Sequence, residues 1–268
     1  MLFSVLSSGS KANATYVEAG GVRLLVDCGL SGKQAENRMR ELGVDPTTLD
    51  AIVVTHEHGD HINGVGTLSR RYNLPVYANE ATMQHISKPR GKEIFKTGEA
   101  FSIGDIQIEP FSIVHDAADP VGFSMMSEGL KLVLCTDLGR VTTLVREHLR
   151  DANAILLESN HDQEMLQSCD YRWELKQRIA SAHGHICNET AGQLLAEIAH
   201  PGLLHVVLGH ISERSNTPTL ALEAAHKYLK TVQEKTVGLQ TLLCGSIYES
   251  MPLLRLDNDN ESRLVGNS

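Results

Sequence analysis

The sequence contains no apolar run long enough to cross a bilayer, which argues against a transmembrane helix. Its first ten residues lack the basic segment of a signal peptide, so we expect a cytoplasmic protein. The five cysteines are odd in number and widely spaced, and none forms a Cys-x-x-Cys pair. This spacing argues against a disulfide framework and against a structural zinc knuckle.

Positive charge is also scarce. Lysine and arginine total 24 against 33 acidic residues, and the net charge of −9 argues against a broadly basic nucleic-acid-binding surface. Local basic clusters remain at residues 70–71, 88–96 and 172–178. A metal centre would add positive charge that the formal count omits. The composition therefore weakens the hypothesis of a polyanionic substrate without excluding it.

Strand-like and helix-like segments alternate along most of the chain, with no Gly/Ser-rich linker or tandem repeat. Short strands within residues 2–27 precede an amphipathic helix at 34–42, and residues 106–136 are rich in strands. Each half has strands, then metal-binding residue types at a strand end, then helices. This plan predicts an α/β (α+β) protein, a four-layer αββα sandwich. We expect one domain over residues 1–255 and a disordered polar tail over 256–268.

The most informative motif is Thr-His-Glu-His-Gly-Asp-His at residues 55–61, directly after the apolar run 51–54. An extended backbone there would place His56, His58 and Asp60 on one side, with His61 turning into the next element. One loop with four strong metal-binding side chains can contribute ligands to two ions. A dinuclear centre of this kind points to hydrolysis.

Three further candidate ligands follow predicted strands, at the ends where active sites of α/β proteins gather. A polar residue at a strand end more often caps a turn, so each is weak evidence alone, but together with the first motif they favour a dinuclear site. Imidazole and carboxylate ligands suit two divalent ions of Zn, Mn or Fe. The expected partition is His56, His58 and His115 on one ion, Asp60, His61 and His210 on the other, and Asp137 as the bridge.

This ordered set resembles the His-x-His-x-Asp-His motif and the distant His, Asp and His of metallo-β-lactamase-fold hydrolases. Four further motifs, at residues 8–13, 157–162, 184–188 and 209–212, are similar to the YycJ/WalJ subgroup. The chain departs from the subgroup at Ala12, where Gly is usual, and at Cys187, where Ser is usual. The resemblance extends to about residue 255 and implies 5′-to-3′ exonuclease activity with DNA as the substrate.

The peripheral motifs supply candidates for contacts with the substrate. The polar loop after the first strand could hold a phosphate, or it could be only a tight turn. His185 and His161 are candidates for protonating the leaving oxygen, Asp60 for orienting the attacking water, and Glu158 for orienting a ligand. The candidate substrate-binding residues are Ser8, Ser10, Asn13, Asn160, Asn188 and Ser212, although Asn188 could instead cap a helix.

The preferred hypothesis is hydrolysis of a phosphodiester by a hydroxide that bridges the two metal ions. The acidic net charge keeps open a small phosphodiester, a (thio)ester or a lactam as the substrate. True lactamases of this fold usually have cysteine at the bridging position, so Asp137 favours phosphoesters. Processing of tRNA 3′ ends is less favoured because the chain lacks a Gly/Pro-rich arm, and a non-catalytic metal-binding protein is also less favoured. The sequence gives no indication of the oligomeric state.

Overall fold

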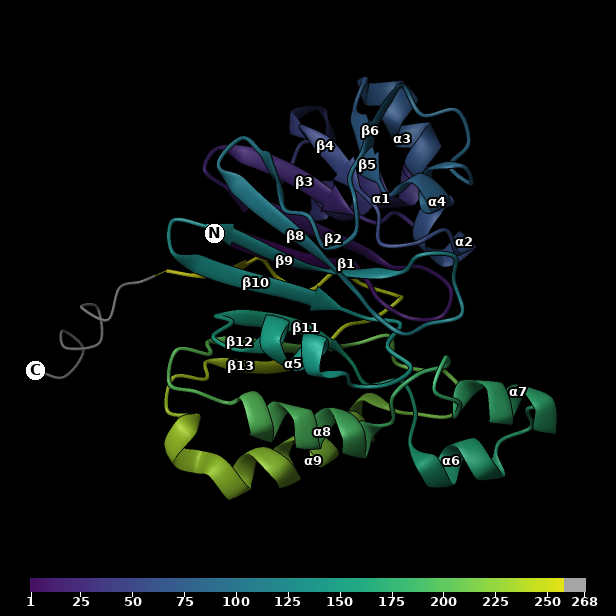
Figure 1. Ribbon diagram of the computed structural model, residues 1–268, viewed down its shortest axis with the longest axis vertical. Coiled ribbons are helices and arrows are strands. Elements are labelled where there is room, and N and C mark those ends of the chain that lie inside the picture. Colours follow the sequence, from purple (N-terminus) through teal and green to yellow (C-terminus); the bar gives the residue numbers. More distant parts are fainter. Residues whose placement is uncertain (258–268) are drawn as a thin grey trace, which may run out of the picture.

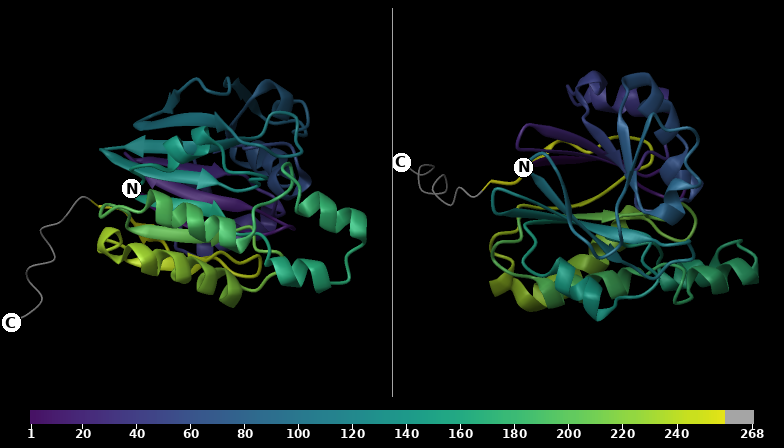
Figure 2. Two further views of the ribbon diagram at one scale, coloured as in Figure 1. Left: turned by 60° about the horizontal axis from the view of Figure 1, so that its bottom comes forward. Right: turned by 45° about the horizontal axis from the view of Figure 1, so that its top comes forward.

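Two seven-stranded sheets lie face to face, and helices cover the outer face of each (Figures 1 and 2). The computed structural model describes residues 1–257. The strand orders are β14-β1-β2-β3-β4-β5-β6 in the first sheet and β13-β12-β11-β10-β9-β8-β7 in the second. The predicted four-layer αββα sandwich is therefore confirmed.

The first sheet is built mainly from the N-terminal third of the chain. Its strands are β1 (Leu2–Ser7), β2 (Ala14–Ala19), β3 (Val22–Val26), β4 (Ala51–Val53), β5 (Pro75–Ala78), β6 (Gly91–Ile94) and β14 (Leu254–Arg255). The helices of this half are α1 (Gly32–Glu41), the 3₁₀ helix η1 (Pro46–Thr48), α2 (Gly59–Ile62), α3 (Val65–Tyr72) and α4 (Glu80–Met83).

The second sheet follows in sequence. Its strands are β7 (Phe101–Ile103), β8 (Ile106–Ser112), β9 (Val121–Ser127), β10 (Leu130–Cys135), β11 (Ala154–Glu158), β12 (His205–Gly209) and β13 (Thr241–Cys244). Its helices are α5 (Thr143–Leu149), α6 (Gln163–Ser168), α7 (Trp173–Ile179), α8 (Asn188–Ile198), α9 (Pro218–Leu229) and the 3₁₀ helix η2 (Lys230–Lys235). Figure 1 shows α6 and α7 at one end of this half, beyond the edge of the sheet.

Successive residues of the central strands belong to different apolar layers. Leu24 of β3 packs between the two sheets, whereas Leu25 packs against the outer helices of the first sheet. In β11, Leu156 faces the other sheet, and Ile155 faces the helices of the second half. Side chains of a strand point alternately to its two faces, so a strand covered on both faces is apolar throughout. This explains why these segments show continuous apolar runs.

Parallel pairing brings the functional strand ends together. Strands β3, β4 and β5 run parallel in the first sheet, as do β10, β11, β12 and β13 in the second. The carboxyl ends of parallel strands lie at one edge of a sheet, where ligand sites of such folds gather. Six of the seven predicted metal ligands follow β4, β10 and β12, and the seventh, His115, follows β8.

The extended arrangement predicted for the metal-binding loop is wrong for Asp60. Helix α2 begins at Gly59, so Asp60 lies in its first turn together with His61. Backbone contacts hold this turn, because Asn13 N donates to Asp60 O at 2.8 Å and Cys28 N donates to His61 O at 2.7 Å. The hydrogen bonds come from residues more than 30 positions away and could not be read from the local pattern.

Some helices and strands begin or end at other residues than predicted, and several short ones were not predicted from the sequence. The helix expected at 34–42 instead spans Gly32–Glu41 (α1), and the strand-rich stretch 106–136 contains β8, β9 and β10. Strands β6 and β7 and helices α2 and α6 are too short for a clear periodic pattern. Within the described residues, no helix combines the length and apolar character needed to span a membrane.

The end of the domain also differs in detail from expectation. Leu256, placed in the predicted tail, is 1% exposed, and its N–H donates to Met1 O. Strand β14 pairs with β1, with Leu254 opposite Phe3. Leu256 thus belongs to the folded unit, while residues 258–268 of the predicted tail lie outside the described part of the chain. A single domain over 1–255 stays a prediction.

Gly29 provides a test of how the metal-binding turn is held. A Cβ atom at this position would lie 1.6 Å from Asp60 O, a backbone atom that cannot move without displacing α2. We expect Gly29→Ala to lower the free energy of unfolding by about 1–3 kcal/mol. At Gly59 the nearest atom would be Asn63 Oδ1, at an ordinary 3.4 Å, so Gly59→Ala is the matched control. Chemical denaturation measures both; equal stability of the two variants would contradict this account.

Candidate metal centre

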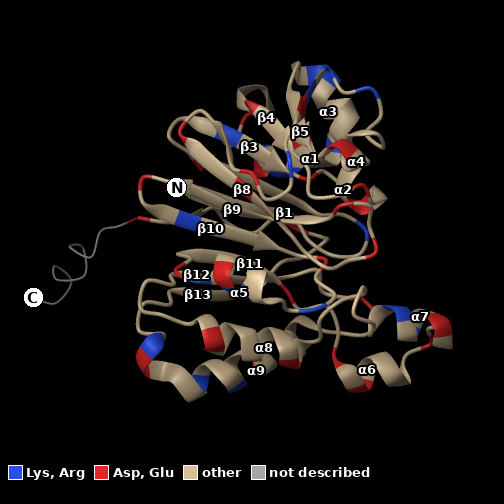
Figure 3. Cartoon of the chain, in the orientation of Figure 1, with Lys and Arg blue, Asp and Glu red and all other residues tan. Residues whose placement is uncertain are grey.

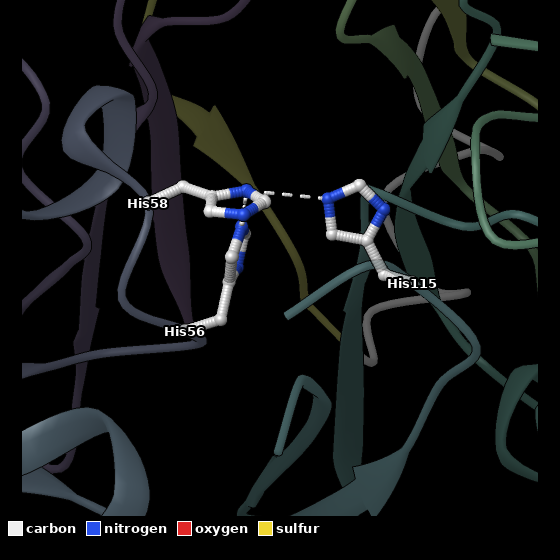
Figure 4. Close-up of side chains that lie close together, drawn as sticks. All are labelled: His56, His58 and His115. Carbon is white, nitrogen blue, oxygen red and sulfur yellow. Dashed lines mark hydrogen bonds between the residues drawn. The ribbon is translucent and has the colours of Figure 1, made fainter. Parts of the chain in front are cut away.

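Three histidines form the first group of donor atoms (Figure 4). His56 Nε2 and His115 Nε2 lie 3.1 and 3.3 Å from His58 Nδ1. Ligands of one tetrahedral ion at ~2.0–2.1 Å would be separated by about 3.3 Å. His56 and His58 come from the loop after β4, and His115 comes from the loop after β8, so the two halves of the sandwich meet here. The three nitrogens are spaced as ligands of one ion.

Asp137 lies between this group and the remaining predicted ligands. Its Oδ2 is 3.2 Å from His61 Nε2, and its Oδ1 is 3.4 Å from His210 Nδ1 and 3.7 Å from His115 Nε2. One carboxylate therefore faces histidines from both halves of the molecule. This is the position that a bridging ligand would take.

The donor atoms of the second predicted group, Asp60, His61 and His210, lie farther apart than those of the first group. Asp60 Oδ2 lies 3.5 Å from His61 Nε2 and 3.8 Å from His210 Nε2. Asp137 instead belongs to two closer groups of possible donor atoms. One group also contains His56 and His61, and the other also contains Glu158, His185 and His210. The structure thus brings all seven predicted ligands together, but it does not by itself divide them between two ions.

Unpaired buried atoms support metal binding at this centre. Within the described residues, Asp137 Oδ2 and His210 Nε2 are buried and make no hydrogen bond. A buried polar atom without a partner costs about 1–3 kcal/mol, so such atoms need a reason to persist. A coordinated ion would satisfy both atoms. The donor set of imidazoles and carboxylates therefore fits divalent metal.

The local electrostatics favours positive charge. Burial alone would raise the pKa of Asp137, but His210 and His61 hold it well below its usual value. Burial would lower the pKa of His210, yet Asp137, Asp60 and Glu158 raise it to about 10. Positive charge on His61 and His210 thus compensates the buried carboxylates, whereas burial lowers the pKa of His56 and of His115. Divalent ions would supply that charge instead.

Two buried carboxylates orient the histidines. Glu158 Oε1 accepts hydrogen bonds from the Nδ1 atoms of His185 and His210, both at 2.8 Å, and Oε2 accepts one from Leu138 N at 2.7 Å. Asp27 Oδ2 accepts hydrogen bonds from His61 Nδ1 and Thr55 Oγ1, both at 2.8 Å. These bonds leave Nε2 of His61 and His210 facing the centre. The orienting role expected of Glu158 agrees with its contacts, whereas Asp27 was not predicted to take part in the site.

Three residues of the site adopt left-handed backbone conformations at strand ends. The φ angles are 58° at Asp27, 58° at Asp137 and 55° at His210. Non-glycine residues in this region carry strain of about 1–2 kcal/mol. The sharp change of direction turns each side chain toward the centre just after β3, β10 and β12. The surrounding hydrogen bonds and packing maintain the strained turns.

Comparison with known proteins identifies the family. Residues 22–211 match the model of the Beta-lactamase superfamily domain. The chain belongs to this superfamily. It is 41% identical over 243 residues to exodeoxyribonuclease YycJ of Bacillus anthracis, a match that covers 88% of this chain and 91% of that relative. It is also 41% identical over 227 residues to exodeoxyribonuclease WalJ of Streptococcus pneumoniae, with 82% and 84% covered.

Solved structures agree on the fold. The metallo-β-lactamase fold protein YhfI of Bacillus subtilis superimposes with a TM-score of 0.69 at 16% identity, covering 93% of this chain and 98% of that one. The predicted family, its YycJ/WalJ subgroup and the fold are therefore confirmed. The chain is a hydrolase of the Beta-lactamase superfamily, and its His and Asp clusters can hold divalent metal.

Two of the six predicted substrate-binding residues lie at the candidate metal centre. Asn13 Nδ2 is 3.1 Å from Asp60 Oδ2 and 2.9 Å from His61 Nε2. Ser10 is exposed and lines a cavity of about 350 Å³ over the predicted ligands. The N-terminal loop therefore does reach the site, as a contact of Asp60 and as part of the cavity wall.

The other four predicted substrate-binding residues are buried and bonded to protein groups. Ser8 Oγ accepts a hydrogen bond from His210 N, and Asn160 Nδ2 donates one to His210 O. The Asn188 side chain bonds to Asn216, and its place as a helix cap is taken by Cys187. Ser212 Oγ accepts hydrogen bonds within its own turn. These contacts favour a role in holding the loops that carry His210 and His161.

The two candidate proton donors occupy different positions. His185 lines the cavity over the metal ligands and also a larger neighbouring cavity. His161 lines only the larger cavity, and burial lowers its pKa to about 4. His161 is therefore neutral at neutral pH. Of the two, His185 is better placed beside the predicted ligands.

Three side chains of the cavity over the ligands were not predicted. Asp116 Oδ1 lies 3.4 Å from His115 Nε2, and Arg178 Nε donates to Asp116 Oδ2 at 2.6 Å. Arg178 and Tyr171 line the same cavity. The basic cluster at 172–178 was visible in the sequence, but nothing there showed that the chain folds back over residues 115–116.

Asp27 offers a test of orientation at this centre. We expect Asp27→Asn to weaken metal binding about 10- to 100-fold, since the amide cannot accept hydrogen bonds at both oxygens. Competition with a chromophoric chelator measures the affinity. Asp50→Asn is the control, because Asp50 accepts a hydrogen bond from Arg23 N at the opposite end of the same strands. Unchanged affinity in Asp27→Asn would refute the orienting role.

Proposed function

We propose that the protein is a dinuclear-metal phosphodiesterase that acts as a 5′-to-3′ DNA exonuclease. The observation that carries the proposal is the buried Asp137 carboxylate, with one oxygen facing His61 and the other facing His115 and His210. The names of the YycJ and WalJ relatives support DNA as the substrate. The proposed site of action is the cytoplasm.

The proposed ligands are the seven residues identified from the sequence, with Zn, Mn or Fe as candidate metals. When bound, two divalent ions would lower the pKa of a water molecule and neutralise charge on the phosphate oxygens. Asn13 Nδ2 bonds to Asp60 Oδ2 and so fixes the carboxylate that we propose to orient the water. Ser10 lies in the wall of the cavity over the predicted ligands, where we propose that its hydroxyl contacts the substrate.

His185 is the proposed proton donor to the leaving oxygen. Glu158 holds its Nδ1 at 2.8 Å, so the proton to be transferred is on Nε2, the other ring nitrogen. The imidazole is partly exposed in the cavity, with 18% of its side chain accessible. Glu158 also holds His210, and this shared carboxylate couples the position of the proton donor to that of a metal ligand.

A small phosphodiester is the second candidate substrate. The cavity over the ligands has a volume of only about 350 Å³, and the net charge is −9. Against this, α7 carries Lys176 and Arg178 in its last turn, and Arg178 lines this cavity; Figure 3 shows blue (Lys, Arg) as well as red (Asp, Glu) on this helix. Asp137 at the bridging position also makes a lactam a less favoured substrate. DNA therefore remains the preferred substrate.

Digestion of end-labelled DNA tests the proposal. Duplexes with 5′-phosphate or 5′-hydroxyl ends are incubated with the protein and Mn(II) or Zn(II). We expect nucleotides to be released progressively from the 5′ end, and His58→Ala to lose this activity at least about 100-fold. Turnover of bis(p-nitrophenyl) phosphate without any DNA cleavage would favour the small substrate, and retained cleavage by His58→Ala would rule out the proposed centre.

Substitution of His185 tests the proton donor separately. We expect His185→Asn to lower kcat on DNA about 100-fold, because general acid catalysis contributes factors of about 10²–10⁴. The loss with bis(p-nitrophenyl) phosphate should be much smaller, since nitrophenolate leaves without a proton. His183→Ala is the control, an exposed histidine two positions away. Equal losses on both substrates would show that His185 acts in another way.

A further inference from the structure

A second, larger cavity lies beside the one over the metal ligands. Its volume is about 780 Å³, and it is lined by residues of α6, α7 and the start of α8. Helix α7 separates the two cavities: Trp173, Lys176 and Gln177 line the larger one, whereas Arg178 and Ile179 line the smaller one. His185 lines both. A ligand in the larger cavity would therefore lie next to the proposed reaction centre.

Helix α7 has no buried residue, although helices usually bury an apolar stripe. Trp173 is 66% exposed and Leu175 is 38% exposed. Among the described residues, no aromatic ring stacks on Trp173. An indole ring exposed at the rim of a cavity offers a flat apolar face to a planar ligand.

The polar lining suits a nucleotide. Three glutamines, Gln163, Gln167 and Gln177, offer amide donors and acceptors of the kind that recognise the edge of a base. Arg140 makes no ion pair with any described residue, so its guanidinium is available to a phosphate. The volume lies within the range of about 300–1,000 Å³ that is usual for small-ligand sites.

His161, a residue of the wall of this cavity, carries a buried polar atom without a partner among the described residues. His161 is 3% exposed and lines the cavity, and its Nδ1 has no hydrogen-bond partner within residues 1–257. Buried polar atoms are almost always paired, so this nitrogen needs a partner that the chain does not supply.

We propose that this cavity holds one unpaired nucleotide of a single-stranded DNA end, with its base stacked on Trp173. The proposal rests on the proposed exonuclease function and extends it to how the strand is held. Because His185 lines both cavities, this nucleotide would lie next to the one whose phosphodiester is cleaved. Base stacking also explains binding without requiring a basic surface, in keeping with the acidic net charge.

The fluorescence of Trp173 gives a direct test, because it is the only tryptophan of the chain. The full-length protein in chelator, which prevents cleavage, is titrated with a single-stranded oligonucleotide and with a blunt duplex of the same sequence. We expect saturable quenching by the single strand, and weaker quenching by the duplex, whose end bases are paired.

Kinetic measurements on variants complete the test. We expect Trp173→Ala to raise KM for single-stranded DNA about 5- to 100-fold with little change in kcat, the loss typical of one base–aromatic stack. Trp173→Phe, which keeps a ring, should restore most of the affinity. Val237→Ala is the control, since Val237 is 69% exposed and lines neither cavity. Thermal melting followed by circular dichroism confirms that each variant is folded.

The possible results separate this inference from the proposed function. Normal DNA cleavage with unquenched fluorescence, or with an unchanged KM in Trp173→Ala, would overturn the nucleotide cavity and leave the exonuclease proposal intact. Saturable quenching by the single strand without any cleavage would support the cavity and contradict the exonuclease. Quenching as strong with the blunt duplex would overturn the choice of an unpaired nucleotide.

Discussion

The site depends on one buried carboxylate at the junction of the two sheets. Asp137 is 2% exposed, and its oxygens face His61 from the first half and His115 and His210 from the second. A carboxylate without water around it must be compensated by positive charge or by hydrogen bonds. Here His61 and His210, whose pKa values the carboxylate raises, supply positive charge. The same requirement suits the junction to divalent ions, which its His and Asp clusters can hold.

Strained backbone conformations at the strand ends bring these charged side chains together. Asp27, Asp137 and His210 each follow a strand in a left-handed conformation. Packing between the sheets fixes the strands, and the hydrogen bonds to Asp27 and Glu158 fix the rings of His61 and His210. Strain of this kind persists where the surroundings determine the conformation, and it gathers at functional sites. The packing and hydrogen bonds of the rest of the sandwich therefore hold these strained residues in the geometry of the site.

The layers, which the structure confirms, and the candidate ligands, which it brings together, could be predicted because both leave local signals in the sequence. Apolar strands followed by helices indicate the αββα plan, and four metal-binding side chains within residues 56–61 are rare in any other role. The sequence could not predict Asp27 as a partner of His61, because the two are 34 positions apart and only the sheet brings them together. Which polar side chains are buried could not be predicted from the sequence either. Ser8 and Asn160 have the side chains of substrate-binding residues, yet both hold the backbone of His210.

The most direct test of the account is anomalous diffraction from crystals of the metal-loaded protein, recorded on both sides of the metal absorption edge. The account predicts two ions about 3.5–4 Å apart, one contacting His56, His58 and His115 and the other contacting Asp60, His61 and His210, with Asp137 bound to both. A single ion at full occupancy, or two ions with Asp137 bound to neither, would contradict it.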